Sequence, residues 1–159
     1  MKQDWKWVDI VKPPQVRSLP DILSLQEVRQ IINRLEKRRY KACLFTIYSM
    51  GLRLGEGLSL KVADIDSECM KVHIRHGKGG RSRYVPLPQT TLQLLCHYWK
   101  THRNPHLLFP NVNETPQQIR TIETPMDRRG VQQSFKAALS DAHISKNASV
   151  HREIVLPEG

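Results

Sequence analysis

Residues 42–56 read ACLFTIYSMGLRLGE, and this stretch decides the fold. Its first nine residues are apolar on nearly every side, which predicts a helix buried in the middle of the domain. Gly51 is a typical stop for such a helix. The apolar pattern continues beyond it around Arg53 and Glu56. We therefore expect the fold to hold Arg53 in place instead of leaving it freely solvated.

The size and charge of the chain favour one domain that attracts polyanions. A chain of 159 residues is long enough to bury a substantial core but suits a single domain. Its 25 Lys and Arg residues against 15 Asp and Glu residues give a formal net charge of +10. A field of this sign indicates nucleic acid as the first candidate partner and an anionic membrane surface as the second.

Several classes of protein are disfavoured by what the sequence lacks. No apolar run approaches the roughly 20 residues that span a bilayer, and the first residues do not resemble a signal peptide, so we expect a cytoplasmic protein with no membrane partner. Three scattered cysteines predict reduced packing residues. His73 and His76 lack cysteine or carboxylate partners at ligand spacing, so we expect no metal and no cofactor.

The first helix is marked by Ser24 and Glu27, whose spacing is that of a capping box, and by apolar residues at helical spacing after them. We expect this helix to end in the basic residues of 36–41. Two interpretations of that basic patch stay open, namely a solvated helix end and a contact with phosphate. Its cations are Lys37, Arg38, Arg39 and Lys41.

A hairpin is predicted next. Residues 70–75 alternate apolar and polar side chains, the pattern resumes at 84–87, and the turn between them reads GKGGRSR with Lys78 near its tip. This turn is not a nucleotide-binding P-loop, because Gly79 follows the lysine where Ser or Thr would be needed. A nucleotide hydrolase is therefore disfavoured.

The second half of the chain predicts two more helices. The first spans 88–103, and a short buried piece follows at 107–110. Residues 111–123 are polar and predict a loop. Thr124 and Pro125 then fit an N-cap and a first helical position, so we expect the last helix to begin there.

The two ends of the stretch 51–83 both suit a phosphate. A phosphodiester in a five-coordinate state carries extra charge on its non-bridging oxygens, and a planar guanidinium such as that of Arg53 can contact two of them. Such a donor acts best when the fold fixes it before reaction. Lys78 could contact a phosphate or a base edge, or protonate a leaving oxygen. Each signal alone also fits a structural ion pair or a solvated hairpin.

Together, residues 48–66, 77–87 and 108–110 resemble, in order, the first-arginine box, the lysine hairpin and the following segment of the tyrosine recombinases, the phage integrase family. The resemblance runs from about residue 19 to residue 151. It implies a mainly α fold with a small antiparallel β-sheet. It also implies that Arg53 clamps the scissile phosphate, that Lys78 is the catalytic lysine of the hairpin and that Glu56 supports the arginine.

The resemblance breaks after His151, which looks like the start of the family's second-arginine box. The position three residues further holds Ile154, and Arg152 is out of register. The four tyrosines all lie upstream, so the resemblance provides no nucleophile. We therefore expect residues 1–20 to be an extended arm or linker remnant, 21–151 a partial catalytic domain truncated before that arginine and the tyrosine, and 152–159 a tail outside the family pattern.

These observations predict a DNA-binding fragment of a recombinase that cannot cleave DNA alone, with double-stranded DNA as its partner. The alternative is a non-catalytic inhibitor that occupies recombination sites or binds intact recombinase subunits. A relative of the type IB topoisomerases and a basic helical domain without a site are further options. The cations and the histidine that we expect to contact DNA are Lys37, Arg38, Arg39, Lys41, Arg75, His76, Lys78, Arg81 and Arg83.

Overall fold

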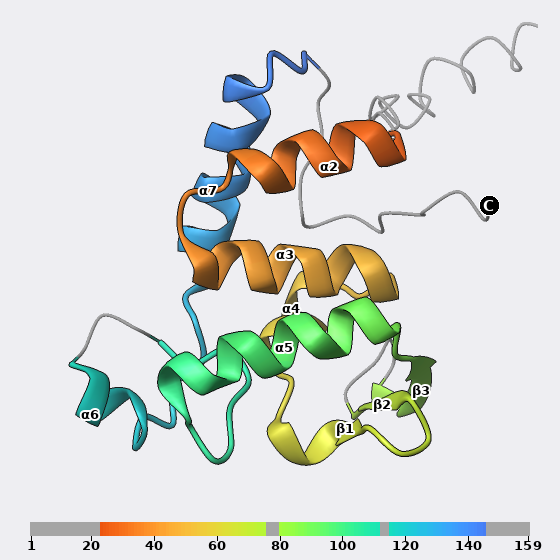
Figure 1. The fold of residues 1–159 in the computed structure, drawn as a ribbon, viewed down its shortest axis with the longest axis vertical. Coiled ribbons are helices and arrows are strands. Elements are labelled where there is room, and N and C mark those ends of the chain that lie inside the picture. The colour runs from red at the N-terminus through yellow and green to blue at the C-terminus, as the bar shows by residue number, and fades with distance from the viewer. Residues whose placement is uncertain (1–22, 76–79, 112–114, 146–159) are drawn as a thin grey trace, which may run out of the picture.

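The computed structural model of the chain describes residues 23–75, 80–111 and 115–145. The predicted fold class is confirmed, because the described residues form helices and one small antiparallel sheet (Figure 1). The expected arm at 1–20 and tail at 152–159 lie outside the described residues. In chain order the elements are α2 (Leu25–Arg34), α3 (Arg38–Met50), α4 (Leu54–Leu58), the 3-10 helix η1 (Val62–Asp64), β1 (Ile65–Asp66), β2 (Lys71–Ile74), β3 (Arg83–Pro86), α5 (Gln89–His102), α6 (Pro116–Ile119) and α7 (Arg128–Asp141).

The central element is α3, which contacts α2, α4, α5 and α7. In Figure 1 it lies between α2 and α5 and runs antiparallel to both, while α7 crosses α2 and α3. Its residues Cys43 and Leu44 are fully buried, and Thr46 is buried with its hydroxyl donating to the Ala42 carbonyl at 2.8 Å. The predicted buried helix is therefore confirmed, and it forms the middle of the core.

The first helix begins as the sequence predicts but ends earlier. Ser24 and Glu27 form the reciprocal bonds of a capping box, in which the Ser24 hydroxyl accepts from the Glu27 N–H and the Glu27 carboxylate accepts from the Ser24 N–H. The helix ends at Arg34, and a new helix begins at Arg38. The expectation that the basic patch lies at the end of the first helix was wrong, because Leu35 leaves the helical conformation and is buried in the core.

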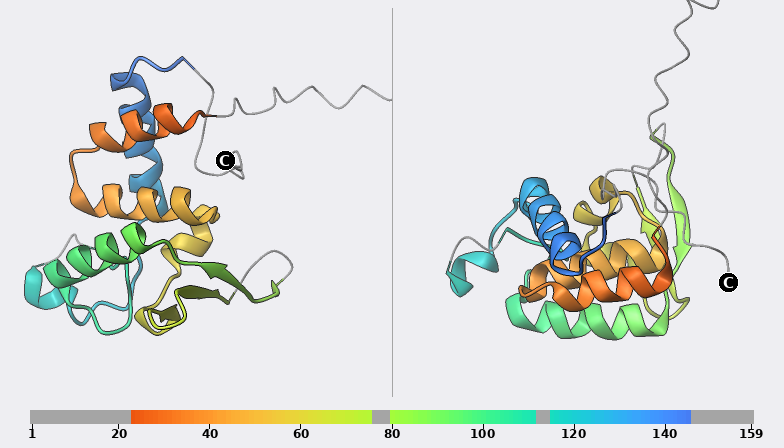
Figure 2. Two further views of the ribbon diagram at one scale, coloured as in Figure 1. Left: turned by 45° about the vertical axis from the view of Figure 1, so that its right-hand side comes forward. Right: turned by 90° about the horizontal axis from the view of Figure 1, so that it is seen from above.

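The sheet stands at one end of the helical body, and its hairpin extends away from the helices (Figure 2). Its strand order is β1-β2-β3, with all pairs antiparallel. Ile74 pairs with Arg83 and His73 with Tyr84 across the predicted hairpin. Val72 and Ile74 are buried, so one face of the hairpin packs on the body and the other is turned outward.

Two elements of the second half depart from the sequence prediction. A short helix, α6, forms inside the expected loop 111–123, with Thr115 and Gln118 as its capping pair. The last helix begins at Arg128 with Asp127 as its N-cap, not at Pro125. Pro125 instead bridges to Pro110, and the Met126 N–H donates to the Phe109 carbonyl, which keeps this segment extended.

Asn104 ties this second half together. Its side-chain amide donates to the carbonyls of Ile119 and Ile122 at 2.8 and 2.9 Å, and its side-chain oxygen accepts from the N–H groups of His106 and Leu107, both at 2.9 Å. The residue is fully buried. One side chain therefore joins the end of α5, the buried segment after it and α6.

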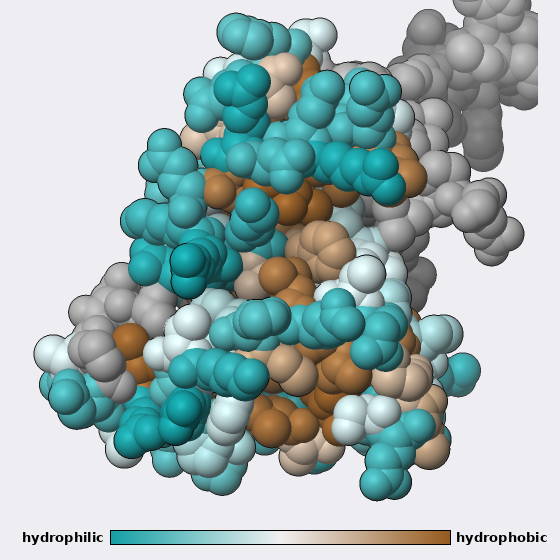
Figure 3. Space-filling view, in the orientation of Figure 1, coloured by the Kyte–Doolittle hydropathy of each residue, from teal (hydrophilic) through white to brown (hydrophobic). Residues whose placement is uncertain are grey.

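On the side shown in Figure 3, polar side chains cover much of the outer faces of the helices, and apolar side chains show in the furrows between them. Among the residues that the structure describes, Leu25 and Tyr84 are the large apolar side chains classed as exposed. In the same part of the chain, no helix is both long and apolar enough to cross a membrane.

Candidate functional site

Arg53 stands at a sharp junction between two helices. Gly51 ends α3 in the left-handed conformation, with φ of 62°, as the sequence predicts for this position. The Leu52 N–H returns to the Ile47 carbonyl at 3.0 Å, and its side chain is buried. Arg53 then adopts an extended conformation as the N-cap of α4 and is half-buried. The junction therefore fixes the point from which the Arg53 side chain leaves the backbone.

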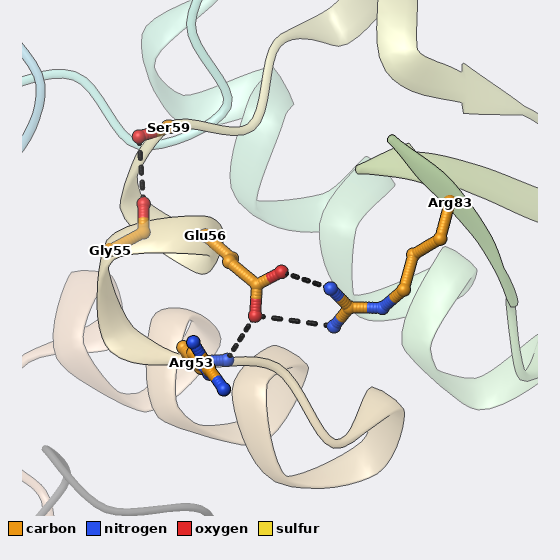
Figure 4. A network of polar contacts seen from close by, with 5 residues as sticks. All are labelled: Arg53, Gly55, Glu56, Ser59 and Arg83. Carbon is orange, nitrogen blue, oxygen red and sulfur yellow. Dashed lines mark hydrogen bonds and ion pairs between the residues drawn. The ribbon is translucent and has the colours of Figure 1, made fainter. Parts of the chain in front are cut away.

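Glu56 holds this junction from inside α4. Its side chain is 5% exposed, and one carboxylate oxygen, Oε1, accepts the backbone N–H of Arg53 at 2.9 Å. The same carboxylate accepts from both terminal nitrogens of Arg83, at 2.5 and 3.2 Å. Figure 4 shows Glu56 between the Arg53 backbone and the Arg83 guanidinium, with Ser59 bonded to the Gly55 carbonyl at the other end of the helix. A buried carboxylate thus connects α4 to β3.

A second buried acid has the same arrangement as the first. The carboxylate of Asp64 accepts the backbone N–H of Lys61 at 3.0 Å and the Nε–H of Arg75 at 2.6 Å. The Asp64 side chain is 3% exposed, and that of Arg75 is 48% exposed. Both Arg75 and Arg83 were expected to contact DNA, and the structure places each of them against an acid. The expected DNA contacts of these two arginines stay a prediction.

The other expected site residues of the hairpin divide into two groups. Arg81 is exposed just before β3, where it is free to face a polyanion. His76 and Lys78 lie outside the described residues, as does His151 at the far end of the chain. Their predicted roles are therefore not tested by the structure.

The basic patch 37–41 lies at the start of α3, whereas Arg53 follows its end. A helix of 13 residues is about 20 Å long, so the structure does not bring the patch to Arg53. The guanidinium of Arg39 stacks on the Tyr40 ring at 4.8 Å, and Lys37 lies 5.9 Å from the same ring. Cation–π contacts offset the unfavourable position of these cations at a helix N-terminus.

Arg38 and Lys41 of the same patch line a cavity of about 330 Å³ together with Leu94, His97 and Tyr98. Arg38 is exposed and Lys41 is half-buried. The sequence prediction that this patch contacts DNA stays a prediction.

Sequence reasoning missed Arg128, which the structure brings to α4. A Cβ atom added to Gly55 would lie 2.8 Å from a terminal nitrogen of Arg128, so that guanidinium rests on the helix that begins after Arg53. No local pattern could have found this contact, because the two residues are far apart in the chain. The acids at the third positions of α4 and η1 do follow the local capping spacing, which signals a bond to the N-cap backbone.

None of the four tyrosines is placed to serve the Arg53 site. Tyr48 and Tyr98 are buried with hydroxyls that have no hydrogen-bond partner, and burial raises the pKa of both phenols. Tyr40 stands at the opposite end of α3, where a Cβ on Gly130 would lie 2.5 Å from its hydroxyl. Tyr84 is exposed, but successive side chains of a strand point to opposite faces, so it points away from the side on which Arg83 contacts Glu56.

No metal centre accompanies this site in the part of the chain that the structure describes, where no three His, Cys, Asp or Glu side chains gather as ligands. The site instead consists of arginines and of the buried carboxylates that contact them. Guanidinium groups bind oxyanions.

The sequence model described as the phage integrase family matches residues 21–153. The chain belongs to the phage integrase family. The family resemblance predicted from the three sequence boxes is therefore confirmed. The first-arginine and hairpin boxes are the segments that Glu56 and Arg83 connect in the structure.

Curated relatives in this family are named as integrases and recombinases. The putative integrase/recombinase y4eF of Sinorhizobium fredii is 38% identical over 111 residues, which cover 69% of this chain and 44% of the relative. The putative integrase/recombinase y4qK of the same organism is 32% identical over 152 residues, 95% of this chain and 47% of the relative. Tyrosine recombinase XerC of Halalkalibacterium halodurans is 30% identical over 146 residues, which cover 87% of this chain and 48% of the relative. The chain spans about half the length of these relatives.

Solved structures show the same fold. The crystal structure of XerA recombinase aligns with a TM-score of 0.66 at 21% identity, over 94% of this chain and 54% of that one. The catalytic core of lambda integrase aligns with a TM-score of 0.62 at 15% identity, over 82% of this chain and 76% of that one. The chain therefore has the fold of a tyrosine recombinase catalytic domain.

Proposed function

We propose that this chain binds double-stranded DNA through its phosphates and that Arg53 contacts the phosphate at the centre of the site. The observation that carries the proposal is the bond from the Arg53 backbone to the buried Glu56 carboxylate. Fixing the Arg53 backbone in advance removes part of the freedom that this residue would otherwise lose when its guanidinium meets a phosphate. That guanidinium can then offer two N–H groups to two phosphate oxygens.

Charge and family support the same partner. The formal net charge of +10 attracts a polyanion over the whole surface. Two structures with the same fold are of the XerH site-specific recombinase bound to its difH substrate. We infer that Lys78 and His151 complete the phosphate site. Arg81 and the basic patch 37–41 add contacts to the DNA backbone, which position a duplex without reading its sequence.

We further propose that the chain alone does not cleave DNA. Strand cleavage by covalent catalysis needs a nucleophile within reach of the phosphate that the arginine holds. Two of the four tyrosines are buried, one stands at the far end of α3 and Tyr84 points away from the Arg53 side. Binding without cleavage would make the chain a competitor for recombination sites, which is how it could inhibit an intact recombinase.

Binding is tested by fluorescence anisotropy with a labelled duplex of random sequence, measured from about 50 to about 200 mM salt. We expect the logarithm of the binding constant to fall linearly with the logarithm of the salt concentration. Arg53→Gln should weaken binding on the order of tenfold, because one charge-assisted phosphate contact is lost. The matched control is Arg120→Gln, which removes an exposed arginine at the end of α6, away from the sheet (Figure 1).

Binding that does not depend on salt would contradict the proposal, because phosphate contacts release counterions. Equal losses in the Arg53 and Arg120 variants would contradict the specific role of Arg53. Circular dichroism of each variant checks that its fold is intact.

A further inference from the structure

Two arginines flank the turn of the hairpin, and both are held by acids of the helical body. Arg75 directly follows β2, and Arg83 opens β3 opposite Ile74. Arg75 contacts Asp64, and Arg83 contacts Glu56. Both strands of the hairpin are therefore attached to the body at the end next to the turn.

The two acids share one design. Each is the third residue of a short helix and accepts the backbone N–H of the residue that caps that helix. Each has a side chain that is at most 5% exposed. A carboxylate with so little exposure keeps its charge only when a cation and hydrogen-bond donors replace the lost water. Arg83 supplies both to Glu56, while Arg75 supplies them to Asp64.

The terminal edge of the Arg83 guanidinium is occupied by Glu56. Its two terminal nitrogens, Nη1 and Nη2, both donate to Glu56. The fork of a guanidinium grips a phosphate with two parallel N–H groups. Arg83 cannot make that grip with its terminal nitrogens while it holds Glu56.

The bond network gives Arg83 a different task. Without its cation, the buried Glu56 carboxylate would turn toward water, and this change would weaken its bond to the Arg53 N–H. We propose that Arg83 is a positioning residue, which holds the Glu56 carboxylate and through it presents Arg53 to the phosphate. This inference rests on the proposed function, and it replaces the direct DNA contact that the sequence suggested for Arg83.

The first test needs no DNA. In the full chain labelled with nitrogen-15, Arg83→Gln should shift the backbone amide resonance of Arg53 and speed its hydrogen exchange. Arg81→Gln, two residues away on the same exposed segment, should leave that resonance in place. Arg83→Lys keeps the charge but offers one nitrogen, so it should restore part of the native shift. An Arg53 amide that stays unchanged in both Arg83 variants would overturn the proposal.

The second test separates positioning from contact. Arg83→Gln should weaken binding to the random duplex on the order of tenfold, as Arg53→Gln does, because both variants disturb the same contact between Arg53 and the phosphate. Arg81→Gln should reduce the magnitude of the salt slope by about 0.9 for one lost contact. Adding Arg83→Gln to Arg53→Gln should cause no further loss. A loss in Arg83→Gln that adds fully to the loss in Arg53→Gln would overturn the proposal, because Arg83 would then make a phosphate contact of its own.

The two tests distinguish a failure of this inference from a failure of the proposed function. If the native chain shows no salt-dependent binding, the proposed function fails, and the Arg53 amide still decides whether Arg83 positions that residue. If native binding is salt-dependent but the variants behave as direct contacts, only the inference fails. The Arg83→Lys variant keeps both tests usable if Arg83→Gln does not fold.

Discussion

Glu56 and Arg83 are 27 residues apart in sequence, and their side chains form a two-contact ion pair with N–O distances of 2.5 and 3.2 Å. The glutamate also bonds to the backbone of Arg53. The arginine junction after α3 and the hairpin that begins with β2 are therefore parts of one site. No local sequence pattern indicates this connection, because the Glu56 carboxylate makes it between segments that are distant in the sequence.

Substitutions at the two glycines of α4 should differ in their effect on the free energy of unfolding. A Cβ on Gly57 would lie 2.6 Å from Cγ1 of Ile47, which is buried in the core. Gly57→Ala should therefore lower the free energy of unfolding by about 1–2 kcal/mol, since overpacking outweighs the gain in helix propensity. The measurement is urea unfolding followed by circular dichroism.

Gly55→Ala in the same helix is the matched control. Its Cβ would meet the end of the Arg128 side chain at 2.8 Å, and that flexible end can move aside. We expect no loss of stability, or a gain of up to about 1 kcal/mol. Equal destabilisation by the two substitutions would contradict the close packing of Ile47 against Gly57.

The buried side-chain amide of Asn104 should contribute more to the stability of the fold than is usual for a residue in a loop. Asn104→Ala removes two donated and two accepted hydrogen bonds and leaves carbonyls and N–H groups of the second half unsatisfied. We expect the free energy of unfolding to fall by about 2–4 kcal/mol. Asn33→Ala, at an exposed position of α2, should change it by less than about 0.5 kcal/mol. A similar small effect at both positions would be incompatible with this network.

Much of the fold follows from local pattern, and the exceptions have identifiable causes. Caps and periodic apolar patterns act within a few residues. They indicate the capping box at Ser24, the buried helix that ends at Gly51 and the hairpin. Strand β1 has two residues, too few for an alternating pattern, and α6 has four. The start of α7 was misplaced because Pro125 suits a helix locally but pairs with Pro110 in the fold.

In the candidate site, too, some contacts follow from local sequence spacing and others depend on the tertiary arrangement. The bond between Glu56 and the Arg53 backbone spans three residues, so the local spacing of a capping box indicates it. The contacts of Glu56 with Arg83 and of Arg128 with α4 depend on the tertiary arrangement. From the sequence, all exposed cations of the hairpin look alike. Only the fold separates Arg81 from an arginine that is paired with a buried acid.

His102 should make stability depend on pH. Its Nδ1 accepts the Asn104 N–H at 3.0 Å and its Nε2 donates to the Leu108 carbonyl at 3.1 Å, an arrangement that requires the neutral ring. Burial lowers the pKa of His102, although the bond to Leu108 opposes that shift. The unfolded chain therefore takes up the proton more readily, so stability should fall as pH falls through the ordinary pKa of about 6.5.

Urea unfolding at about pH 7.5 and about pH 5.5 measures this dependence. His102→Gln should be less stable at both pH values but should show a smaller difference between them. The control is His97→Gln, at an exposed position of the same helix, which should keep the native difference. If His102→Gln keeps the full native difference, another group is responsible for the pH dependence.

The three cysteines should differ in reactivity. Cys43 is fully buried in α3, and burial raises the pKa of its thiol to about 12, so it offers almost no thiolate near neutral pH. Cys69 and Cys96 are exposed. Iodoacetamide followed by mass spectrometry should find two modified cysteines in the folded chain and three in urea. Labelling of Cys43 as fast as Cys69 would contradict the burial of the central helix.

The central claim is that the chain holds a DNA phosphate with Arg53 but has no tyrosine placed to attack it. The most direct measurement mixes the chain with a nicked duplex substrate that traps covalent intermediates and compares native with denaturing electrophoresis. We predict a complex on the native gel that disappears completely on the denaturing gel. A protein–DNA adduct that survives denaturation and is lost in Tyr84→Phe would contradict the account, since Tyr84 would then be the nucleophile.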